Sequence, residues 1–315
     1  MGKLVSRGGA LNLIKETFKA DGIAEELVEA FNKFHAMNIY DDYSIEKQIL
    51  EQTYMDVERI TVREPKDPNV IIFNPSGASK CARELFYKIT RAEEDKGSQI
   101  PFQKRWTRNS TAVHEVIQKD LLYMDKYLRN YHFRVAKAEE IPDINIPEDR
   151  KPFPAWENNI LTTRYFTHNG YYFGIRGMMD GNLIYTPTDE LIGFEIKTKS
   201  TTIASVGDYK LKQPMDSHTQ QCICYSVLFR GDPYEERTDR FIIFYESVAK
   251  DNWNKGASAR ADIKAFEVSV EKADRVRLLD KFAQVCEYVE NGELPPQEFD
   301  KCLFCKYKGV CGVTV

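Results

Sequence analysis

The chain has 315 residues, of which 42% are hydrophobic and 29% charged, and its formal net charge is −4. This composition indicates a globular protein with enough length for a substantial core, and it excludes a polycation that coats nucleic acid through overall charge. Binding to nucleic acid would therefore require local basic patches. No apolar run reaches the length of a membrane span and no secretory signal is evident, so we expect a cytoplasmic protein without membrane attachment.

The N-terminal part, residues 1–78, is predicted to be a mainly helical extension. Apolar positions recur at helical spacing in residues 11–18, 23–37 and 45–60. An Asp-Gly pair at 21–22 separates the first two of these segments. We identify no residue pattern in this extension that indicates chemistry.

Two further helices are expected after residue 79. The first, residues 79–91, carries Cys81 near its start. A polar and basic segment follows, and its Arg105 is a candidate contact for a phosphate backbone. The second helix, residues 111–128, places His114 on its apolar face. A lone histidine on such a face is more often a core residue than a metal ligand. An irregular, proline-containing stretch is expected from about 138 to 160.

The segment after residue 170 spaces acidic and basic side chains in a way that suits metal-dependent phosphodiester hydrolysis. A strand is predicted to end at Asp180, and a second strand carrying Glu195, Lys197 and Lys199 returns after a Pro-Thr-Asp turn. Alternation along that strand puts those three side chains on one face. Two neighbouring carboxylates repel each other unless a cation lies between them, and Mg²⁺ or Mn²⁺ prefers such oxygen ligands.

The ammonium group of Lys197 would stand beside this pair of carboxylates. It could hold the attacking water and offset charge on a phosphate. Taken alone, the spacing fits a solvated hairpin with a chance salt bridge equally well.

The remaining segments predict a mixed α/β core. A buried helix at 214–231 carries Gln221 and Tyr225 one turn apart on one face. Strands are expected at 240–248 and 263–270, followed by an amphipathic helix at 271–292. The predicted fold class is therefore α/β, with a mixed central sheet flanked by helices.

The chain has seven cysteines, and three of them, Cys302, Cys305 and Cys311, lie in a Cys-x2-Cys-x5-Cys pattern. In a cytoplasmic protein such clustering favours metal ligation over disulfides. Three thiolates cannot complete a four-thiolate site, so a fourth ligand must come from elsewhere. Residue types alone leave zinc and an iron-sulfur cluster open.

Asp180 followed by Glu195-x-Lys197 resembles the PD-(D/E)XK nucleases, specifically their RecB-like branch, although Met179 stands where the name-giving proline would be. With His114 upstream, Gln221-x3-Tyr225 downstream and cysteines at both ends, residues 79–315 resemble the iron-sulfur members of that branch. These members are the AddB-type domains and the CRISPR-associated RecB-like exonucleases. The resemblance implies a restriction-endonuclease-like core that forms one nuclease domain over residues 79–315.

The same resemblance implies roles for individual residues. His114, Asp180, Glu195 and the Ile196 carbonyl would bind Mg²⁺ or Mn²⁺, with Gln221 and Tyr225 supporting the site. Cys81 would join the three C-terminal cysteines in a structural [4Fe-4S] cluster, for which zinc is the competing occupant. Arg83 is a candidate DNA contact, together with Arg105 and Lys199 of the local basic patches.

The function that follows from the resemblance is that of a hydrolase, a metal-dependent DNA exonuclease in recombination, repair or phage DNA processing. Its substrate would be DNA with single-stranded or free ends, in a bacterial or phage-infected cytoplasm, with a possible recombination or helicase partner. Two alternatives stay open at this point. One is a DNA-end-binding module without cleavage, and the other is an endonuclease of restriction or CRISPR-adaptation type.

Overall fold

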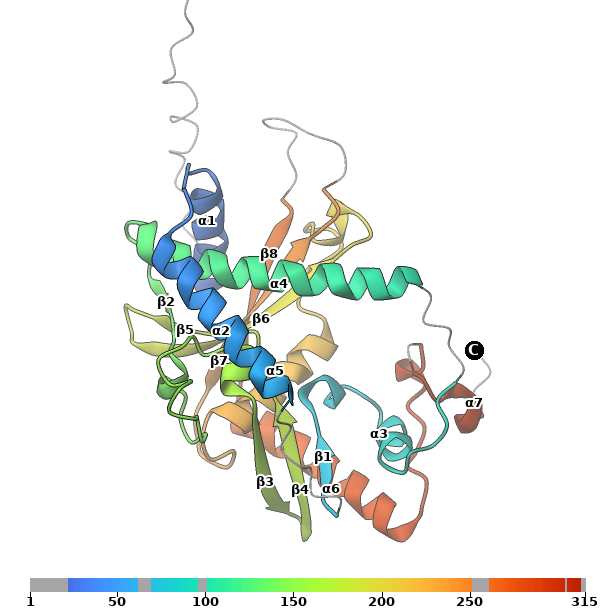
Figure 1. Cartoon of the computed structure of the whole chain (residues 1–315). Helices are drawn as coiled ribbons and strands as arrows, with labels where there is room; N and C mark the ends of the chain where they lie inside the picture. Colours follow the sequence, from blue (N-terminus) through green and yellow to red (C-terminus); the bar gives the residue numbers. More distant parts are fainter. Residues whose placement is uncertain (1–21, 62–68, 96–100, 251–260, 304, 313–315) are drawn as a thin grey trace, which may run out of the picture.

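The computed structural model describes residues 22–61, 69–95, 101–250, 261–303 and 305–312 (Figure 1). Within these residues, eight strands form two separate mixed sheets with helices packed around them. This confirms the predicted mixed α/β class, with the difference that the expected single sheet is divided in two. The strands are β1 Ile71–Phe73, β2 Phe133–Val135, β3 Thr162–His168, β4 Tyr171–Gly177, β5 Gly181–Tyr185, β6 Glu190–Lys199, β7 Asp239–Ser247 and β8 Ile263–Val270.

The larger sheet has the strand order β2-β5-β6-β7-β8, and the smaller one has the order β1-β4-β3. Each sheet contains one parallel pair, β6 with β7 and β1 with β4, and all other pairs are antiparallel. Strands β4 and β5 follow each other directly in the chain but belong to different sheets. The chain therefore passes from one sheet to the other within three residues, 178–180.

Two N-terminal helices are present, α1 (Ile23–His35) and α2 (Tyr43–Thr61), as their apolar spacing predicts. In α1 the buried positions recur every three or four residues, so one stripe of the helix faces the protein, where it packs on β8. The helix predicted at residues 11–18 lies outside the described residues. The boundary proposed at residue 78 stays a prediction.

Helix α4 (Pro101–Tyr127) begins ten residues earlier than the sequence pattern predicts. The end of the polar and basic segment is helical because Pro101 stands at the first helical position and no proline or glycine interrupts the following residues. Figure 1 shows α4 as a long helix that crosses the larger sheet and projects beyond it at its N-terminal end.

The other predicted helices are present as α3 (Ala82–Ile89), α5 (Asp216–Phe229) and α6 (Lys272–Asn291). Helix α6 ends where expected because Gly292 adopts a left-handed conformation with φ of 69°. Short helical turns complete the described structure: η1 Pro75–Gly77, η2 Ala138–Glu140, η3 Glu157–Ile160, η4 Ile203–Ser205, η6 Phe299–Lys301 and α7 Lys308–Cys311. The irregular stretch predicted near 138–160 contains two of them.

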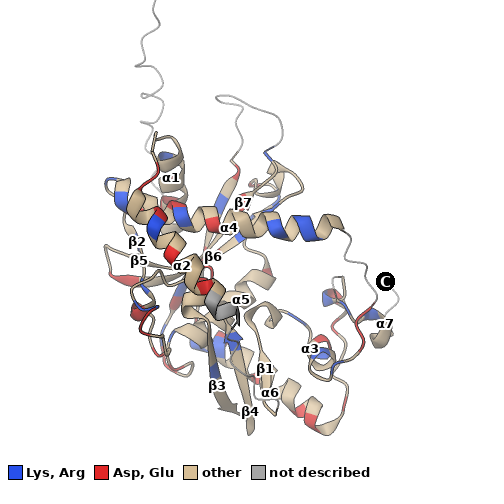
Figure 2. Cartoon of the chain, in the orientation of Figure 1, with Lys and Arg blue, Asp and Glu red and all other residues tan. Residues whose placement is uncertain are grey.

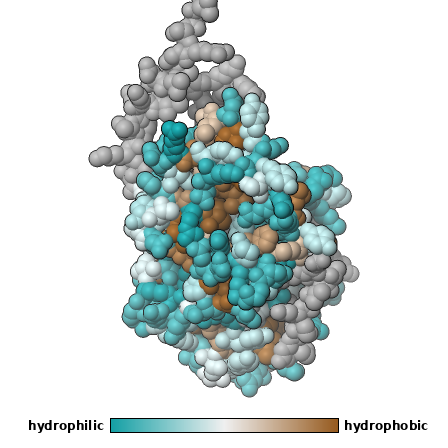
Figure 3. All heavy atoms as spheres, turned by 60° about the vertical axis from the view of Figure 1, so that its left-hand side comes forward, coloured by the Kyte–Doolittle hydropathy of each residue, from teal (hydrophilic) through white to brown (hydrophobic). Residues whose placement is uncertain are grey.

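Two apolar cores lie on opposite sides of the larger sheet. One joins α1 and α4 to inward residues of β6 and β7, and the other joins α5 and α6 to the opposite face and to the smaller sheet. The face drawn in Figure 3 is mostly hydrophilic, with hydrophobic side chains visible in patches. None of the helices in the described part of the chain combines the length and apolar character that a bilayer span requires.

Candidate active site and cysteine cavity

The β5–β6 hairpin brings Asp180 and Glu195 together. Gly181 pairs with Phe194, so the residue before β5 stands beside the residue after Phe194 on β6. The Asp180 carboxylate Oδ2 accepts a hydrogen bond from the Ile196 backbone N–H at 2.8 Å. The strand predicted to end at Asp180 instead ends at Gly177 and belongs to the smaller sheet, so Asp180 precedes its hairpin. The juxtaposition is as predicted, but the strand assignment was wrong.

Glu195 is almost completely buried, with 1% of its surface exposed. Its Oε1 accepts a hydrogen bond from the Lys197 ammonium, whereas its Oε2 has no hydrogen-bond partner among the described residues. Burial raises the pKa of the Glu195 carboxyl, and the negative charge of Asp180 raises it further. A buried, unpartnered carboxylate oxygen beside a second carboxylate is the environment that a divalent cation would stabilise.

A series of hydrogen bonds connects Glu195 to helix α5. The Lys197 ammonium also donates to the Gln221 side-chain oxygen at 3.1 Å, and the Gln221 amide donates to the Tyr225 hydroxyl at 2.6 Å. Phe194 and Ile196 face the other way, into the α1 and α4 core, as strand alternation predicts. The structure therefore brings Lys197, Gln221 and Tyr225 together on one face of β6.

On the other side of Asp180, helix α4 supplies His114. Its Nδ1 lies 3.5 Å from Asp180 Oδ1. Burial alone would lower the pKa of His114, but the hydrogen bond and charge of Asp180 outweigh it and raise that pKa. The carboxylate of Glu157 completes the group, because ligand atoms of His114, Glu157 and Asp180 all lie within 4.8 Å of one another.

Glu157 and Gln118 are the residues that sequence reasoning missed. Burial and the charge of Asp180 raise the pKa of Glu157 to about 7. The Gln118 amide donates to the Asp180 backbone carbonyl at 2.7 Å, and its nitrogen lies 3.5 Å from Glu157 Oε1. Gln118 stands one helical turn after His114, which is a usable signal. Glu157 lies in an irregular stretch, and no local pattern marks it.

These residues fit a hard divalent cation. Two carboxylates and one imidazole, from Asp180, Glu157 and His114, have ligand atoms within 4.8 Å of one another. The carboxylate of Glu195, which is not one of these three, adds a buried oxygen without a partner among the described residues. Carboxylate oxygens are the ligands that Mg²⁺ and Mn²⁺ prefer. The predicted contribution of the Ile196 carbonyl stays a prediction.

The predicted DNA contacts lie in different places. Arg105 is exposed on the projecting part of α4, whose ribbon in Figure 2 is blue at its lysine and arginine positions. Lys199 ends β6 beside the Tyr245 ring, 5.4 Å from its centroid. Arg83 lies apart from both and donates to the Pro295 carbonyl at 2.6 Å. Its predicted role at DNA stays a prediction, while its contacts belong to the cysteine cavity.

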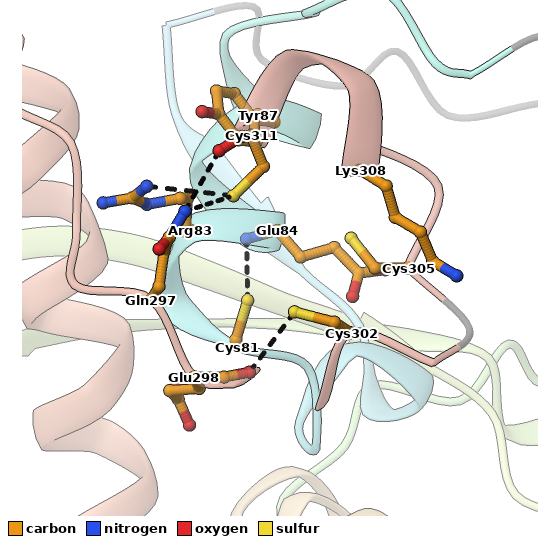
Figure 4. A pocket seen from close by; sticks show the side chains of 10 residues that line it. All are labelled: Cys81, Arg83, Glu84, Tyr87, Gln297, Glu298, Cys302, Cys305, Lys308 and Cys311. Atoms are coloured by element: carbon orange, nitrogen blue, oxygen red, sulfur yellow. Dashed lines mark hydrogen bonds between the residues drawn. The ribbon is translucent and has the colours of Figure 1, made fainter. Parts of the chain in front are cut away.

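Cys81, Cys302, Cys305 and Cys311 line one small cavity between α3 and the C-terminal segment (Figure 4). Cys81 is the N-cap of α3, where its sulfur accepts a hydrogen bond from the Glu84 N–H at 3.2 Å. Among the described residues, the His114 group has its ligand atoms within 4.8 Å of one another. The four thiols do not meet this distance.

Hydrogen-bond donors surround the cavity sulfurs. The Gln297 amide lies 3.3 Å from the Cys311 sulfur, and the Arg83 guanidinium lies 3.8 Å from it. The Tyr307 N–H donates to the Cys305 sulfur at 3.4 Å. Donors of this kind stabilise thiolates. Burial acts in the opposite direction and raises the pKa of the Cys81 and Cys305 thiols, and the nearby carboxylates of Glu298 and Glu84 raise that of Cys81 further. The remaining cysteines, Cys222, Cys224 and Cys286, are buried in the main core, away from the cavity.

With this geometry in view, the comparisons define the class of protein. Residues 74–312 match the model of the PD-(D/E)XK nuclease superfamily. The chain belongs to this superfamily, whose members are nucleases that use divalent metal ions. A phosphodiester-hydrolysing enzyme acting on DNA follows from that membership.

Among solved structures, the chain is similar to SSO0001 at 14% sequence identity, over 85% of this chain and 93% of that one, with a TM-score of 0.42. At that TM-score the likeness carries no conclusion. No curated protein matches the chain significantly.

Proposed function

We propose that this nuclease is a DNA exonuclease of the RecB-like iron-sulfur branch. The observation that carries the catalytic part is the unpartnered, buried Oε2 of Glu195 beside the cluster of His114, Glu157 and Asp180. The branch is supported by the order of the motifs along the chain. The order is the same as in that family: a cysteine, a histidine, the Asp-Glu-Lys hairpin, Gln-x3-Tyr and three cysteines.

In this proposal Mg²⁺ or Mn²⁺ would be bound by Asp180, Glu195, His114 and Glu157. The backbone carbonyl of Ile196 would be a further ligand. The bound ion supplies Lewis-acid activation of the phosphate and lowers the pKa of a water molecule. Lys197 is held by Glu195 and Gln221, so its ammonium is fixed where it can orient a water and offset developing charge. Tyr225 keeps Gln221 in place from α5.

The cysteine cavity is proposed to hold a [4Fe-4S] cluster, with zinc as the alternative occupant. Four thiols converge on one cavity, and nitrogen donors reach three of their sulfurs. A cluster there would tie α3 to a segment far away in the sequence. Such a tie lowers the conformational entropy of the unfolded chain and so stabilises the domain.

The exonuclease assignment, with 5′-phosphate and 3′-hydroxyl products, follows the same resemblance. The proposed setting is recombination, repair or phage DNA processing in the cytoplasm, with a helicase or recombination partner. The carboxylates and Lys197 argue against a module that only binds DNA ends, because such a module needs no buried, paired lysine beside two carboxylates.

The experiment is an anaerobic purification with a visible spectrum and an iron assay, followed by digestion of end-labelled linear and closed circular DNA. Each DNA is incubated with Mg²⁺, Mn²⁺ or EDTA. The proposal predicts brown protein that degrades only linear DNA, and only with metal. Cleavage of closed circles would replace the exonuclease by an endonuclease. Firm DNA binding without cleavage in either metal would contradict a catalytic function.

A further inference from the structure

Two aromatic side chains are exposed on the projecting part of α4. Phe102 and Trp106 have 58% and 42% of their surfaces exposed, and their ring centroids lie 5.8 Å apart. They stand one helical turn apart, so they share a face of the helix. Large aromatic residues are costly to expose to water, so such a pair indicates a binding surface.

These rings line a groove of about 600 Å³ between α4 and the ends of strands β6 and β7. Its other lining residues are polar or basic, apart from one valine: Arg105, Arg108, Asn109, Ser200, Thr201 and Val248. Within the described part of the chain, neither arginine is paired with a carboxylate. The Ser200 hydroxyl also has no hydrogen-bond partner among the described residues. The groove therefore combines aromatic faces, positive charge without a carboxylate partner, and the Ser200 hydroxyl, which has no hydrogen-bond partner among the described residues.

The groove lies on the same helix and next to the same strand as the catalytic hairpin. The Ser110 hydroxyl contacts the Thr198 hydroxyl at 2.8 Å, which fixes α4 against β6 next to Lys197. Trp106 and His114 lie on the same uninterrupted helix, and eight residues of helix span about 12 Å. A chain of nucleotides in the groove would therefore reach the carboxylates within a few residues of its own length.

We propose that this groove binds single-stranded DNA, with bases stacked on Phe102 and Trp106 and phosphates held by Arg105 and Arg108. The proposal rests on the nuclease function and names its substrate as a single strand. Stacking on side chains requires free base faces, and in a duplex each face is covered by the neighbouring base pair. Alternating aromatic and basic groups are the means by which proteins bind single strands without sequence preference.

The test measures binding of fluorescein-labelled oligo-dT and of a blunt duplex, by anisotropy in EDTA, so that no cleavage intervenes. Wild-type protein is compared with Phe102→Ala, Trp106→Ala and the double variant. The expected result is single-strand affinity reduced roughly 5- to 100-fold per ring, with duplex affinity changed much less. Because both rings are exposed, the melting temperature should stay unchanged, and Trp106→Phe should restore most of the affinity.

A matched control is available elsewhere on the surface. Tyr165 and Tyr172, on β3 and β4, are exposed by 48% and 57%, and their ring centroids also lie 5.8 Å apart. Changing both to alanine should leave oligo-dT binding unaltered. For the charge component, Arg105→Ala should reduce the slope of log affinity against log salt by about 0.7, the value expected for one lost phosphate contact on a single strand.

The outcomes separate the groove from the nuclease function. Full oligo-dT affinity in the double variant, or equal losses for duplex and single strand, would overturn the groove while leaving metal-dependent cleavage untouched. Selective loss of single-strand binding in a protein that never cleaves would support the groove and refute the nuclease function on which the substrate assignment rests.

Discussion

The hairpin site and the cysteine cavity are assembled in different ways. Asp180 and Glu195 face each other because backbone hydrogen bonds pair β5 with β6, and that sheet is covered on both faces by apolar cores. The cysteine cavity joins the start of α3 to a segment containing only the short helical turns η6 and α7. The carboxylates are thus preorganised by the sheet. The described part of the cysteine segment contains no strand and is held instead by contacts with the loop after α3, where Asp95 pairs with the backbone of Lys306, Lys308 and Gly309.

This contrast predicts that the two sites respond differently to loss of a ligand. Removing a group from the hairpin should abolish chemistry and leave the fold intact, because the sheet holds its geometry. Removing a cysteine should weaken the fold, because the proposed cluster would supply much of the stability there.

The largest effect on activity is expected at the hairpin. Asp180→Ala and Lys197→Ala should each lower the rate of DNA cleavage by roughly 10²- to 10³-fold or more, since the first removes a proposed metal ligand and the second removes the ammonium that would offset charge on the phosphate. Circular dichroism and thermal melting should show folded protein. Lys33→Ala, an exposed lysine on α1, serves as the control. Full activity in either hairpin variant would remove that residue from the catalytic set.

The largest effect on stability is expected at the cysteine cavity. Cys302→Ala should lose iron and on the order of several kcal/mol of unfolding free energy, because the cluster can no longer link α3 to the C-terminal segment. Iron content and melting temperature measure this directly. Cys286→Ala is the control, because Cys286 is also buried but lies in the main core. If Cys302→Ala keeps its iron, Cys302 is not a ligand.

A smaller effect is expected at Glu157. Glu157→Gln should weaken Mn²⁺ binding and metal-supported cleavage by roughly 10- to 100-fold, because it removes one charged oxygen from the His114 group. Titration calorimetry with Mn²⁺ gives the affinity. Glu148→Gln, whose side chain is 87% exposed in the same irregular stretch, should behave as wild type. Equal affinities in all three proteins would exclude Glu157 from the metal site.

The smallest effect is expected at Gln118. Its amide positions the Asp180 backbone and contacts no reacting group, so Gln118→Ala should remove about 1 kcal/mol, or roughly five-fold in cleavage rate. The loss should appear as a higher metal concentration for half-maximal rate. A loss as large as that of Asp180→Ala would mean that Gln118 does more than position the aspartate.

The hairpin could be predicted from sequence because its information is local. Strand alternation puts Glu195 and Lys197 on one face, and a short connection returns β6 to Asp180. The same holds for α5, where a four-residue step puts Gln221 near Tyr225. The three-residue strands β1 and β2 were missed because segments that short carry no measurable periodicity.

Glu157 could not be predicted in the same way. It reaches the site only because its backbone N–H bonds to the Met179 carbonyl, a contact between segments that no local pattern connects. The projecting half of α4 was missed because its residues are nearly all exposed, so no apolar stripe indicates a helix there. Glu157 is placed by a contact with another segment, and the exposed half of α4 lacks the apolar stripe that would predict a helix.

The most direct test compares cleavage of end-labelled linear DNA by wild-type and Glu195→Gln protein across a range of Mn²⁺ concentrations, with EDTA as the zero point. The buried carboxylate should make cleavage wholly metal-dependent in the wild type. The variant should cleave roughly 10²- to 10³-fold more slowly at every concentration while melting within a few degrees of wild type. Equal rates in the two proteins, or cleavage in EDTA, would contradict a metal-dependent centre at this hairpin.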